Sequence, residues 1–328
     1  MLQNGKTWYD TDGNPIHAHG GHLLHAKDGY YYWYGENRMG GAYVSVYRSR
    51  DLATWEFRNH VLTVDSRCEK ARVKSADLTL YREIDDETYV QLSQSTQAVN
   101  PVIVHHGKKL AKINVERPKV LYCEATGKYV LWAHYENGRD YSAAAALVAT
   151  CDTPDGDFVY HGSFNPYGAM SRDCTLFLDD DGRAYFISAS RDNRDLHFYR
   201  LTPDFLNVSR LVGIAFQGES REAPAVFKRN GKYYILTSYC TGWAPNQGQF
   251  AIADQIDGDW SIPGNFGDAT TFRSQPAFVL QKDGVEYYVG DRWEGGGDAY
   301  FTSSYVVLPI RYHDDGTPYI TDSQSAPF

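Results

Sequence analysis

Residues 226–236 read VFKRNGKYYIL: an apolar run, a turn built on Asn230-Gly231, and a tyrosine-rich apolar run. Asn-Gly between two apolar runs is a strong signal for a tight β-hairpin, because both turn positions favour positive φ angles. The same pattern recurs in four other places along the chain. The five turn glycines are Gly29, Gly127, Gly182, Gly231 and Gly284.

The spacing of these hairpins decides the architecture. The last four turn glycines are separated by 55, 49 and 53 residues. Further strand-like pieces follow each hairpin, so each repeat has room for four strands, as in a propeller blade. No window keeps the helical period of 3.6 residues for three turns. Two stacked sandwiches would not explain near-equal spacing. The pattern therefore predicts an all-β fold, a five-bladed β-propeller.

One interval breaks the regular spacing. Gly29 and Gly127 are 98 residues apart, and the polar segment at about 61–114 between them lacks the repeat. We interpret that segment as an excursion between the first and second blades, not as a sixth repeat. We therefore expect one propeller domain over residues 1–328.

Composition narrows the possible partners. The 328 residues are 42% hydrophobic and carry a net charge of −9, which argues against electrostatic binding of nucleic acid. No apolar run approaches the 18 residues of a membrane span. Aromatic residues are abundant, with 26 Tyr, 15 Phe and 7 Trp, which suits both strands and sugar-stacking surfaces.

The cysteines and the N-terminus bear on location. The five Cys are scattered without a CxxC pair or zinc-like spacing, which suggests reduced thiols. The first residues, MLQNGKTW, lack the charged and apolar regions of a signal peptide. We therefore expect a cytoplasmic protein, although a secreted protein whose leader had been removed would read the same.

A polar residue recurs at one equivalent position of each repeat, four residues before the apolar anchor of the first strand. These residues are His19, Glu116, Asp173, Glu222 and Gln275. Because the innermost strands of a propeller line its central channel, we expect these side chains to converge at one end of it. Arg117, Arg172 and Arg221 flank three of the acids, so an ion-pair network, or a merely solvated channel, is the alternative interpretation.

Converging carboxylates have a specific chemical use. Mutual repulsion and burial raise carboxyl pKa values, and groups whose pKa values are forced apart can act as acid and base. Glycoside hydrolysis needs one acid to protonate the leaving oxygen and one group to activate water on the far side. The sequence therefore predicts a glycosidase.

Several strings of the sequence support this prediction. The sequence resembles glycoside hydrolase family 43, and most closely its exo-β-1,3-galactanase-like subgroup. The matching strings span about residues 17–293: AHGG at 18–21, YYWYGEN at 31–37, ERPKV at 116–120, SRD at 171–173, EAPAVF at 222–227, TGWAPN at 241–246 and SQ at 274–275. The resemblance implies a five-bladed propeller and an inverting mechanism.

The resemblance also implies catalytic roles. Glu222 is similar to the general acid of the family, and Asp173 to the carboxylate that orients the acid and adjusts its pKa. The usual first-blade base, an Asp, is replaced by His19, a departure that the galactanase-like subgroup shares. In that subgroup the residues at the Gln275 and Glu116 positions are implicated in catalysis. Gln275 would hold the attacking water, as an amide or as its imidic acid tautomer, and Glu116 would hold the water or a sugar hydroxyl.

Six further residues are candidates for binding the sugar. Glu36 resembles a substrate-binding carboxylate, Trp243 lies in a loop suited to stacking on a sugar, and Arg292 precedes Trp293. The complete set is Glu36, His19, Tyr135, Trp243, Asn246 and Arg292. We assign no cofactor and no metal ligand, since the His residues show no fixed ligand spacing, although the family allows a calcium ion or water at the channel centre.

The expected function is an exo-acting, inverting glycoside hydrolase that releases galactose from β-1,3-linked galactosyl oligosaccharides. The same chemistry as an α-L-arabinofuranosidase or a β-D-galactofuranosidase remains open. A non-catalytic sugar-binding propeller is the alternative of another class, which the missing first-blade Asp favours and the retained acids oppose. A phosphorylase would need a basic phosphate cradle, and no such sequence is evident.

Overall fold

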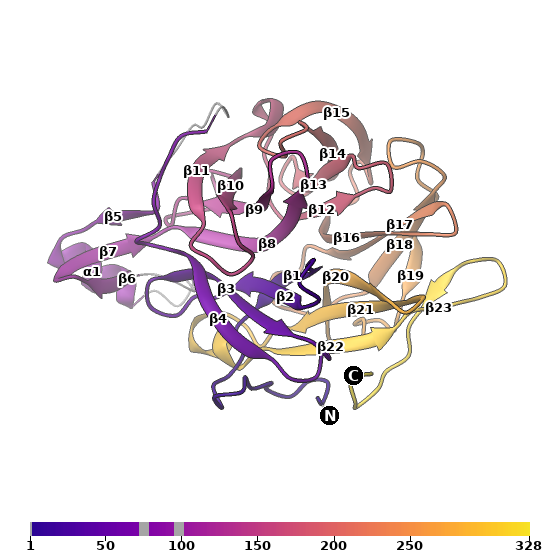
Figure 1. Cartoon of the computed structure of the whole chain (residues 1–328), viewed down its shortest axis with the longest axis horizontal. Coiled ribbons are helices and arrows are strands. Elements are labelled where there is room, and N and C mark those ends of the chain that lie inside the picture. The colour runs from indigo at the N-terminus through magenta and orange to yellow at the C-terminus, as the bar shows by residue number, and fades with distance from the viewer. Residues whose placement is uncertain (1, 72–78, 95–101) are drawn as a thin grey trace.

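The computed structural model describes residues 2–71, 79–94 and 102–328. Five antiparallel sheets are arranged around a common centre (Figure 1). The first blade consists of β1 (His19–His25), β2 (Tyr31–Glu36), β3 (Ala42–Ser49) and β4 (Glu56–Thr63). The second consists of β8 (Asn114–Cys123), β9 (Lys128–Glu136), β10 (Ala145–Cys151) and β11 (Val159–Phe164).

The remaining three blades follow in chain order. The third consists of β12 (Cys174–Leu178), β13 (Ala184–Ser190), β14 (Asp195–Leu201) and β15 (Val208–Ala215). The fourth consists of β16 (Arg221–Arg229), β17 (Lys232–Tyr239), β18 (Gly248–Ala253) and β19 (Gly264–Phe266). The fifth consists of β20 (Gln275–Lys282), β21 (Val285–Arg292) and β22 (Ser304–Pro309). A small hairpin, β23 (Arg311–Tyr312) with β24 (Pro318–Tyr319), comes after it.

The first strands of the blades close the ring. Strand β1 contacts β8, β8 contacts β12, β12 contacts β16, β16 contacts β20, and β20 contacts β1 again. Figure 1 shows these five strands near the centre of the molecule, with the other strands of each blade outside them. The predicted five-bladed β-propeller is confirmed.

All five predicted hairpins join the first two strands of a blade. In the fourth blade, Asn230 and Gly231 adopt φ angles of 49° and 78°, and in the fifth Asp283 and Gly284 adopt 51° and 77°. Two successive positive φ angles make the tight turn that matches the twist of the paired strands. The turn chemistry read from the sequence therefore sets the register of the inner hairpins.

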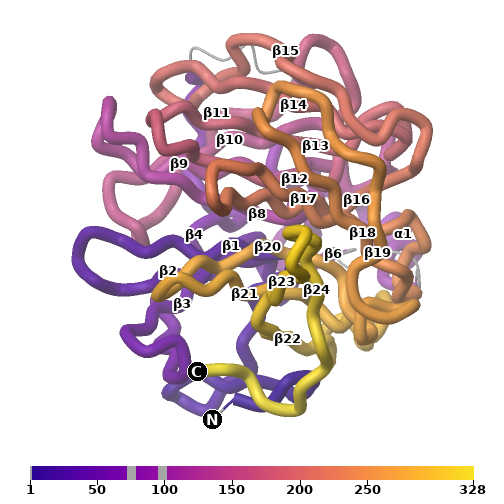
Figure 2. The backbone as a smooth tube through the Cα atoms, turned by 90° about the vertical axis from the view of Figure 1, so that its right-hand side faces the viewer, coloured from indigo at the N-terminus to yellow at the C-terminus, as the bar shows by residue number. Residues whose placement is uncertain are grey.

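The fifth blade has three strands within the continuous described range 102–328, where the repeat predicts four. Its outer edge is covered by the N-terminal segment instead. Gly5 N donates to Tyr305 O at 2.8 Å, and the Asn4 side chain exchanges hydrogen bonds with the backbone of Val307 at 3.1 and 2.9 Å. Both termini consequently lie side by side, as Figures 1 and 2 show.

The excursion occupies residues 64–113, because Val61 belongs to β4 and Asn114 begins β8. Its described part contains β5 (Tyr81–Glu83), α1 (Asp86–Ser93), β6 (Val102–His105) and β7 (Lys108–Lys112), with the sheet order β5-β7-β6. Asp85 caps α1 by accepting a hydrogen bond from Thr88 N at 2.8 Å. No helix in the described ranges is long and apolar enough to cross a membrane.

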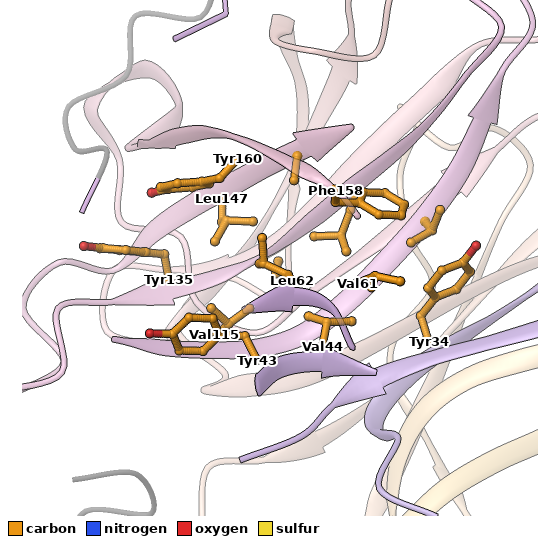
Figure 3. Packing of buried hydrophobic residues seen from close by; sticks show 14 of the residues in the cluster. Tyr34, Tyr43, Val44, Val61, Leu62, Val115, Tyr135, Leu147, Phe158 and Tyr160 are labelled. Atoms are coloured by element: carbon orange, nitrogen blue, oxygen red, sulfur yellow. The ribbon is translucent and has the colours of Figure 1, made fainter. Parts of the chain in front are cut away.

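A hydrophobic cluster joins the first two blades to the excursion (Figure 3). Val44 and Leu62 come from the first blade and Leu147 from the second, and each is fully buried. Burying one such side chain stabilises the fold by about 1.5–3 kcal/mol. Tyr43 donates its hydroxyl to the backbone oxygen of Leu80, so the excursion is fixed to this core.

Candidate active site

Four inner strands bring their first residues to one cavity of about 610 Å³. Glu116 lies in β8, Asp173 immediately before β12, Glu222 in β16, and Gln275 at the start of β20. Six of the ten predicted site residues line this cavity: Glu36, Glu116, Asp173, Glu222, Trp243 and Gln275. The structure thus brings together acids that lie far apart in the sequence.

Local backbone irregularities direct these side chains. The strand register shifts between Glu116 and Lys119 and again between Glu222 and Ala225, which marks a β-bulge at each site. Arg117 and Ala223, the residues after the two acids, have φ angles of 52° and 53°. Such left-handed residues are rare and cluster at functional sites, where a bulge re-aims a neighbouring side chain.

Glu222 has the protonation expected of a general acid. Burial and the negative charge of Asp173 raise the pKa of Glu222 to about 7, although the charge of Arg117 opposes the shift. Oε1 of Glu222 accepts a hydrogen bond from Gln275 Nε2 at 3.0 Å, and Oε2 lies 3.4 Å from Asn193 Nδ2. The carboxyl group is therefore largely protonated below pH 7, as donation to a leaving oxygen requires.

Asp173 links the acid to a buried arginine. Its Oδ2 pairs with Arg117 Nε at 2.7 Å and accepts a hydrogen bond from Ala223 N at 3.0 Å. The second contact holds the backbone next to Glu222. Asp173 therefore orients Glu222 as well as raising its pKa.

The orientation of the Gln275 amide is fixed by its partners. Arg117 Nη2 and Trp293 Nε1 both donate to Gln275 Oε1, the latter at 2.8 Å. Guanidinium and indole N–H groups are donors only, so Oε1 must face them and Nε2 must face Glu222. Nε2 also donates to Ser238 Oγ at 3.0 Å. Two donors on Oε1 favour the amide form of Gln275 over the imidic acid.

Glu116 is held as a carboxylate. Its Oε1 accepts hydrogen bonds from Tyr141 OH at 2.6 Å and Arg38 Nη2 at 3.1 Å, and its Oε2 lies 3.1 Å from His134 Nδ1. Burial alone would raise the pKa of Glu116, but the contacts with His134 and Arg38 outweigh it and place the pKa well below its usual range. Such a weak base is suited to accepting hydrogen bonds from sugar hydroxyls.

His134 connects this carboxylate to a second buried one. Its Nε2 lies 2.9 Å from Glu136 Oε1, and the side chains of both residues are almost fully buried. Burial disfavours the imidazolium, but contacts with Glu116 and Glu136 raise the pKa of His134 to about 10. A charged His134 between two carboxylates therefore fixes one wall of the cavity.

Glu36 is the fourth acid of the cavity. Its Oε2 accepts hydrogen bonds from Arg38 Nε at 3.1 Å and Nη2 at 2.8 Å. Burial raises the pKa of Glu36, the charge of Arg38 opposes the shift, and the charge of Glu116 adds to it. The Arg38 guanidinium also lies over the Tyr300 ring at 4.7 Å. Arg38 thus bridges two acids that would otherwise repel each other.

Aromatic side chains form the opposite wall. Trp243 is 40% exposed and packs edge-on against Trp293, with 5.5 Å between ring centroids. Both residues line the cavity. An indole face that borders a polar cavity suits the apolar face of a sugar ring.

Four predicted binding residues lie outside the cavity lining. His19 is fully buried, with Nδ1 3.3 Å from Asp291 Oδ1. Tyr135 is buried in the core between the first two blades and directs its hydroxyl to Thr79 O at 3.4 Å (Figure 3). Arg292 pairs with Asp322 at 3.2 Å. Asn246 bonds the backbone of Tyr239 and lines a small recess beside Trp243.

Comparison with known proteins identifies the family. The family described as Glycosyl hydrolases family 43 matches this chain over residues 118–251. An exo-β-1,3-galactanase from Clostridium thermocellum is 41% identical with a TM-score of 0.80, and the match covers 97% of this chain and 64% of that one. An exo-β-1,3-galactanase variant from Phanerochaete chrysosporium, solved with β-1,3-galactotriose, is 30% identical with a TM-score of 0.77, covering 98% and 67%.

The chain belongs to glycoside hydrolase family 43. A family 43 β-1,3-galactosidase solved with galactodeoxynojirimycin is 29% identical, with a TM-score of 0.81 and full coverage of both chains. The present chain thus spans slightly less than two thirds of the Clostridium thermocellum chain and the whole of this galactosidase. No curated protein matches the chain.

Several residues that line the cavity of this family 43 chain were not predicted from the sequence as site residues. They are Arg38, Arg117, His134, Tyr141 and Asn193. A usable signal existed for His134, because the hairpin at Gly127 places it directly opposite Glu116. The corresponding strand pairing in the fourth blade places Ser238 opposite Glu222. Counting back across each predicted turn would have found these partners.

Two groups of described residues place possible metal-ligand atoms within 4.8 Å of one another: Asp65 with His105 and His106, and Glu116 with His134 and Asp173. In the second group, Glu116 and Asp173 already pair with arginines, and His134 is charged. Direct ion pairs therefore account for this family 43 site, and no step of the chemistry below is assigned to a metal.

Proposed function

We propose that this family 43 protein is an exo-acting, inverting hydrolase that releases galactose from the non-reducing end of β-1,3-linked galactosyl oligosaccharides. The observation that carries the proposal is the cavity in which a protonated Glu222 adjoins Asp173 and Gln275 and faces an ionised Glu116. The likeness to galactanases and galactosidases over nearly the whole chain supports the choice of sugar.

Glu222 supplies the proton for bond cleavage. It protonates the glycosidic oxygen as the bond from that oxygen to the anomeric carbon breaks. A water molecule attacks the anomeric carbon from the opposite face, which inverts the configuration, and it releases a proton to the surrounding water, from which Glu222 is reprotonated. Asp173 keeps Glu222 protonated in the resting enzyme because its negative charge raises the pKa of the acid.

The remaining cavity residues orient the sugar and the water. Glu116, fixed by Arg38, His134 and Tyr141, accepts hydrogen bonds from sugar hydroxyls. Gln275 lies beside the acid and helps to position the attacking water once substrate displaces part of its present hydrogen bonding. Trp243 stacks against the sugar ring.

The test is product analysis on a panel of substrates. β-1,3-Galactobiose and β-1,3-galactotriose are incubated with the protein beside aryl β-galactopyranoside, β-galactofuranoside, α-L-arabinofuranoside and β-xyloside. We expect free galactose from β-1,3-galactobiose and β-1,3-galactotriose, with α-galactose as the first anomer seen by NMR. If the protein hydrolysed only the two furanosides, its substrate would be a furanoside and not a β-1,3-linked galactopyranoside. Sugar binding without any hydrolysis would make the protein a lectin.

A further inference from the structure

Two arginines that line the cavity have, among the described residues, either no carboxylate at ion-pair distance or only an exposed one. The cavity is lined by Arg139 and Tyr141, from the loop between β9 and β10, and by Arg172 near β12. Within the described residues, the Arg139 guanidinium has no carboxylate at ion-pair distance, although the Arg139 backbone N–H bonds Asn137 Oδ1 at 2.7 Å. The arginines deeper in the cavity, Arg38 and Arg117, are both paired with acids.

Arg172 is only partly satisfied. Its Nη2 donates to Tyr141 O at 3.1 Å and to Asp192 Oδ1 at 3.2 Å, and Asp192 is 72% exposed. An ion pair with so exposed a partner contributes little. The Nε of Arg172 is buried and has no hydrogen-bond partner among the described residues. Buried donors are normally satisfied, so this N–H needs an acceptor that the described residues do not supply.

A third arginine adds to the positive charge. Arg82 lies in β5 of the excursion, and in the part of the chain that the structure describes its buried Nε also finds no hydrogen-bond partner. Burial lowers the pKa of Arg82, and the nearby charge of Arg139 lowers it further. These two like charges therefore lie close together. The arrangement is unexpected on a chain of net charge −9.

Asp140 also lines the cavity, and it lies near enough to Arg139 for their charges to attract, although the two do not form an ion pair among the described residues. Its Oδ1 accepts hydrogen bonds from Ser142 N at 2.9 Å and from Asn137 Nδ2 at 3.0 Å. Asp140 therefore stabilises the turn of its own loop. The guanidinium groups remain available to a ligand.

We propose that Arg139 and Arg172 bind a carboxylate carried by the oligosaccharide, that of a uronic acid on the part of the substrate beyond the cleaved bond. The proposal rests on the proposed function, because it places the neutral terminal sugar at Glu222 and the acidic sugar at the rim. Arginine forks match carboxylates with two parallel hydrogen bonds, which a neutral sugar hydroxyl cannot replace. The excursion, through Arg82, adds to the positive potential of this subsite.

The test compares three substrates: neutral β-1,3-galactobiose, the same disaccharide carrying a glucuronic acid on its reducing-end galactose, and the carboxamide of that trisaccharide. We expect kcat/KM on the acid to exceed that on the carboxamide by about tenfold, the size of a charged hydrogen bond. The ratio should fall towards one in Arg139→Gln and Arg172→Gln, and in high salt. The control variant Arg210→Gln, which changes an exposed arginine of β15, should leave the ratio of kcat/KM values unchanged.

The outcomes separate this inference from the proposed function. Cleavage of neutral galactobiose with equal rates on acid and carboxamide would overturn the carboxylate subsite and leave the hydrolase intact. Calorimetric binding of the acid in preference to the carboxamide, without cleavage of any substrate, would support the subsite and overturn the hydrolase. A sulfated disaccharide preferred to the uronic acid would overturn the assignment of a carboxylate.

Discussion

The Gln275 amide donates a hydrogen bond to Oε1 of Glu222 over 3.0 Å. Because Arg117 and Trp293 both donate hydrogen bonds to the amide oxygen, the Gln275 amide cannot flip without losing both of them. Oε1 of Glu222 therefore accepts a hydrogen bond from Gln275, and Oε2 accepts a longer one, of 3.4 Å, from Asn193 Nδ2. A chain of hydrogen bonds thus runs from the Arg117 guanidinium through Gln275 to Glu222 and fixes the orientation of the carboxyl group.

Replacing Gln275 by Ala tests this relationship. Turnover should fall more than KM rises, because the variant loses the group that orients the acid and helps to position water. The hydrogen bond from Gln275 lowers the pKa of Glu222, so its removal should also move the alkaline limb of the pH–rate profile to higher pH. Gln281→Ala, an exposed glutamine of the same strand, is the control. An equal loss of binding and turnover would make Gln275 a binding residue.

Glu222→Gln should lower kcat by a factor of about 10² to 10⁴, because an amide cannot donate the catalytic proton. The loss should be large on galactobiose, whose leaving group needs protonation, and small on a dinitrophenyl galactoside, whose leaving group does not. Steady-state kinetics on the two substrates give the comparison, with Glu219→Gln as an exposed control. Unchanged turnover of galactobiose would remove Glu222 from this role.

Particular residues show how much of the fold and of the site can be predicted from the sequence. The turn glycines and the polar position before each inner strand predict the propeller and place four carboxyl or amide groups in one cavity. His19 occupies the equivalent position, yet Gly20 after it adopts a φ angle of 55°, and the imidazole packs against Tyr305 and pairs with Asp291. A periodic pattern gives the position of a residue but not the direction of a side chain at a bulge.

Other parts of the site depend on contacts between distant segments. Arg38 joins Glu36 to Glu116 across two blades, and no local pattern announces such a partner. Tyr135 is one of the predicted sugar ligands, but strand alternation directs it into the core. Its neighbour His134, on the other face of β9, contacts Glu116 instead. A one-residue shift on a strand thus separates core from cavity.

Asp173→Asn should shift the pH dependence of catalysis. The negative charge of Asp173 raises the pKa of Glu222, and its removal also leaves the opposing Arg117 charge unpaired beside the acid. Both changes lower the pKa of Glu222, so the alkaline limb should move from near pH 7 to lower pH. Rates measured across the pH range should show the shift, whereas a scaled but unshifted profile would contradict the electrostatic role.

His134→Leu should destabilise the fold as well as the site. The substitution leaves Glu136, which is fully buried, without its cationic partner, and breaking a buried pair in this way costs about 3–5 kcal/mol. Urea unfolding would measure the loss, with His25→Leu, an exposed histidine of β1, as the control. The double variant His134→Leu with Glu136→Leu should recover part of the stability, because it removes the unpaired charge.

The pH dependence of that stability loss identifies its cause. The pKa of His134 is raised from an ordinary value of 6.5 to about 10, so the charged imidazolium contributes its full stability below pH 6.5. The contribution declines as the pH rises from 6.5 towards 10, because the unfolded chain has released the His134 proton while the folded protein still holds it. The difference in unfolding free energy between the wild type and His134→Leu should therefore shrink over that interval. A difference that stayed constant across it would show that packing around the imidazole, and not its charge, stabilises this wall of the cavity.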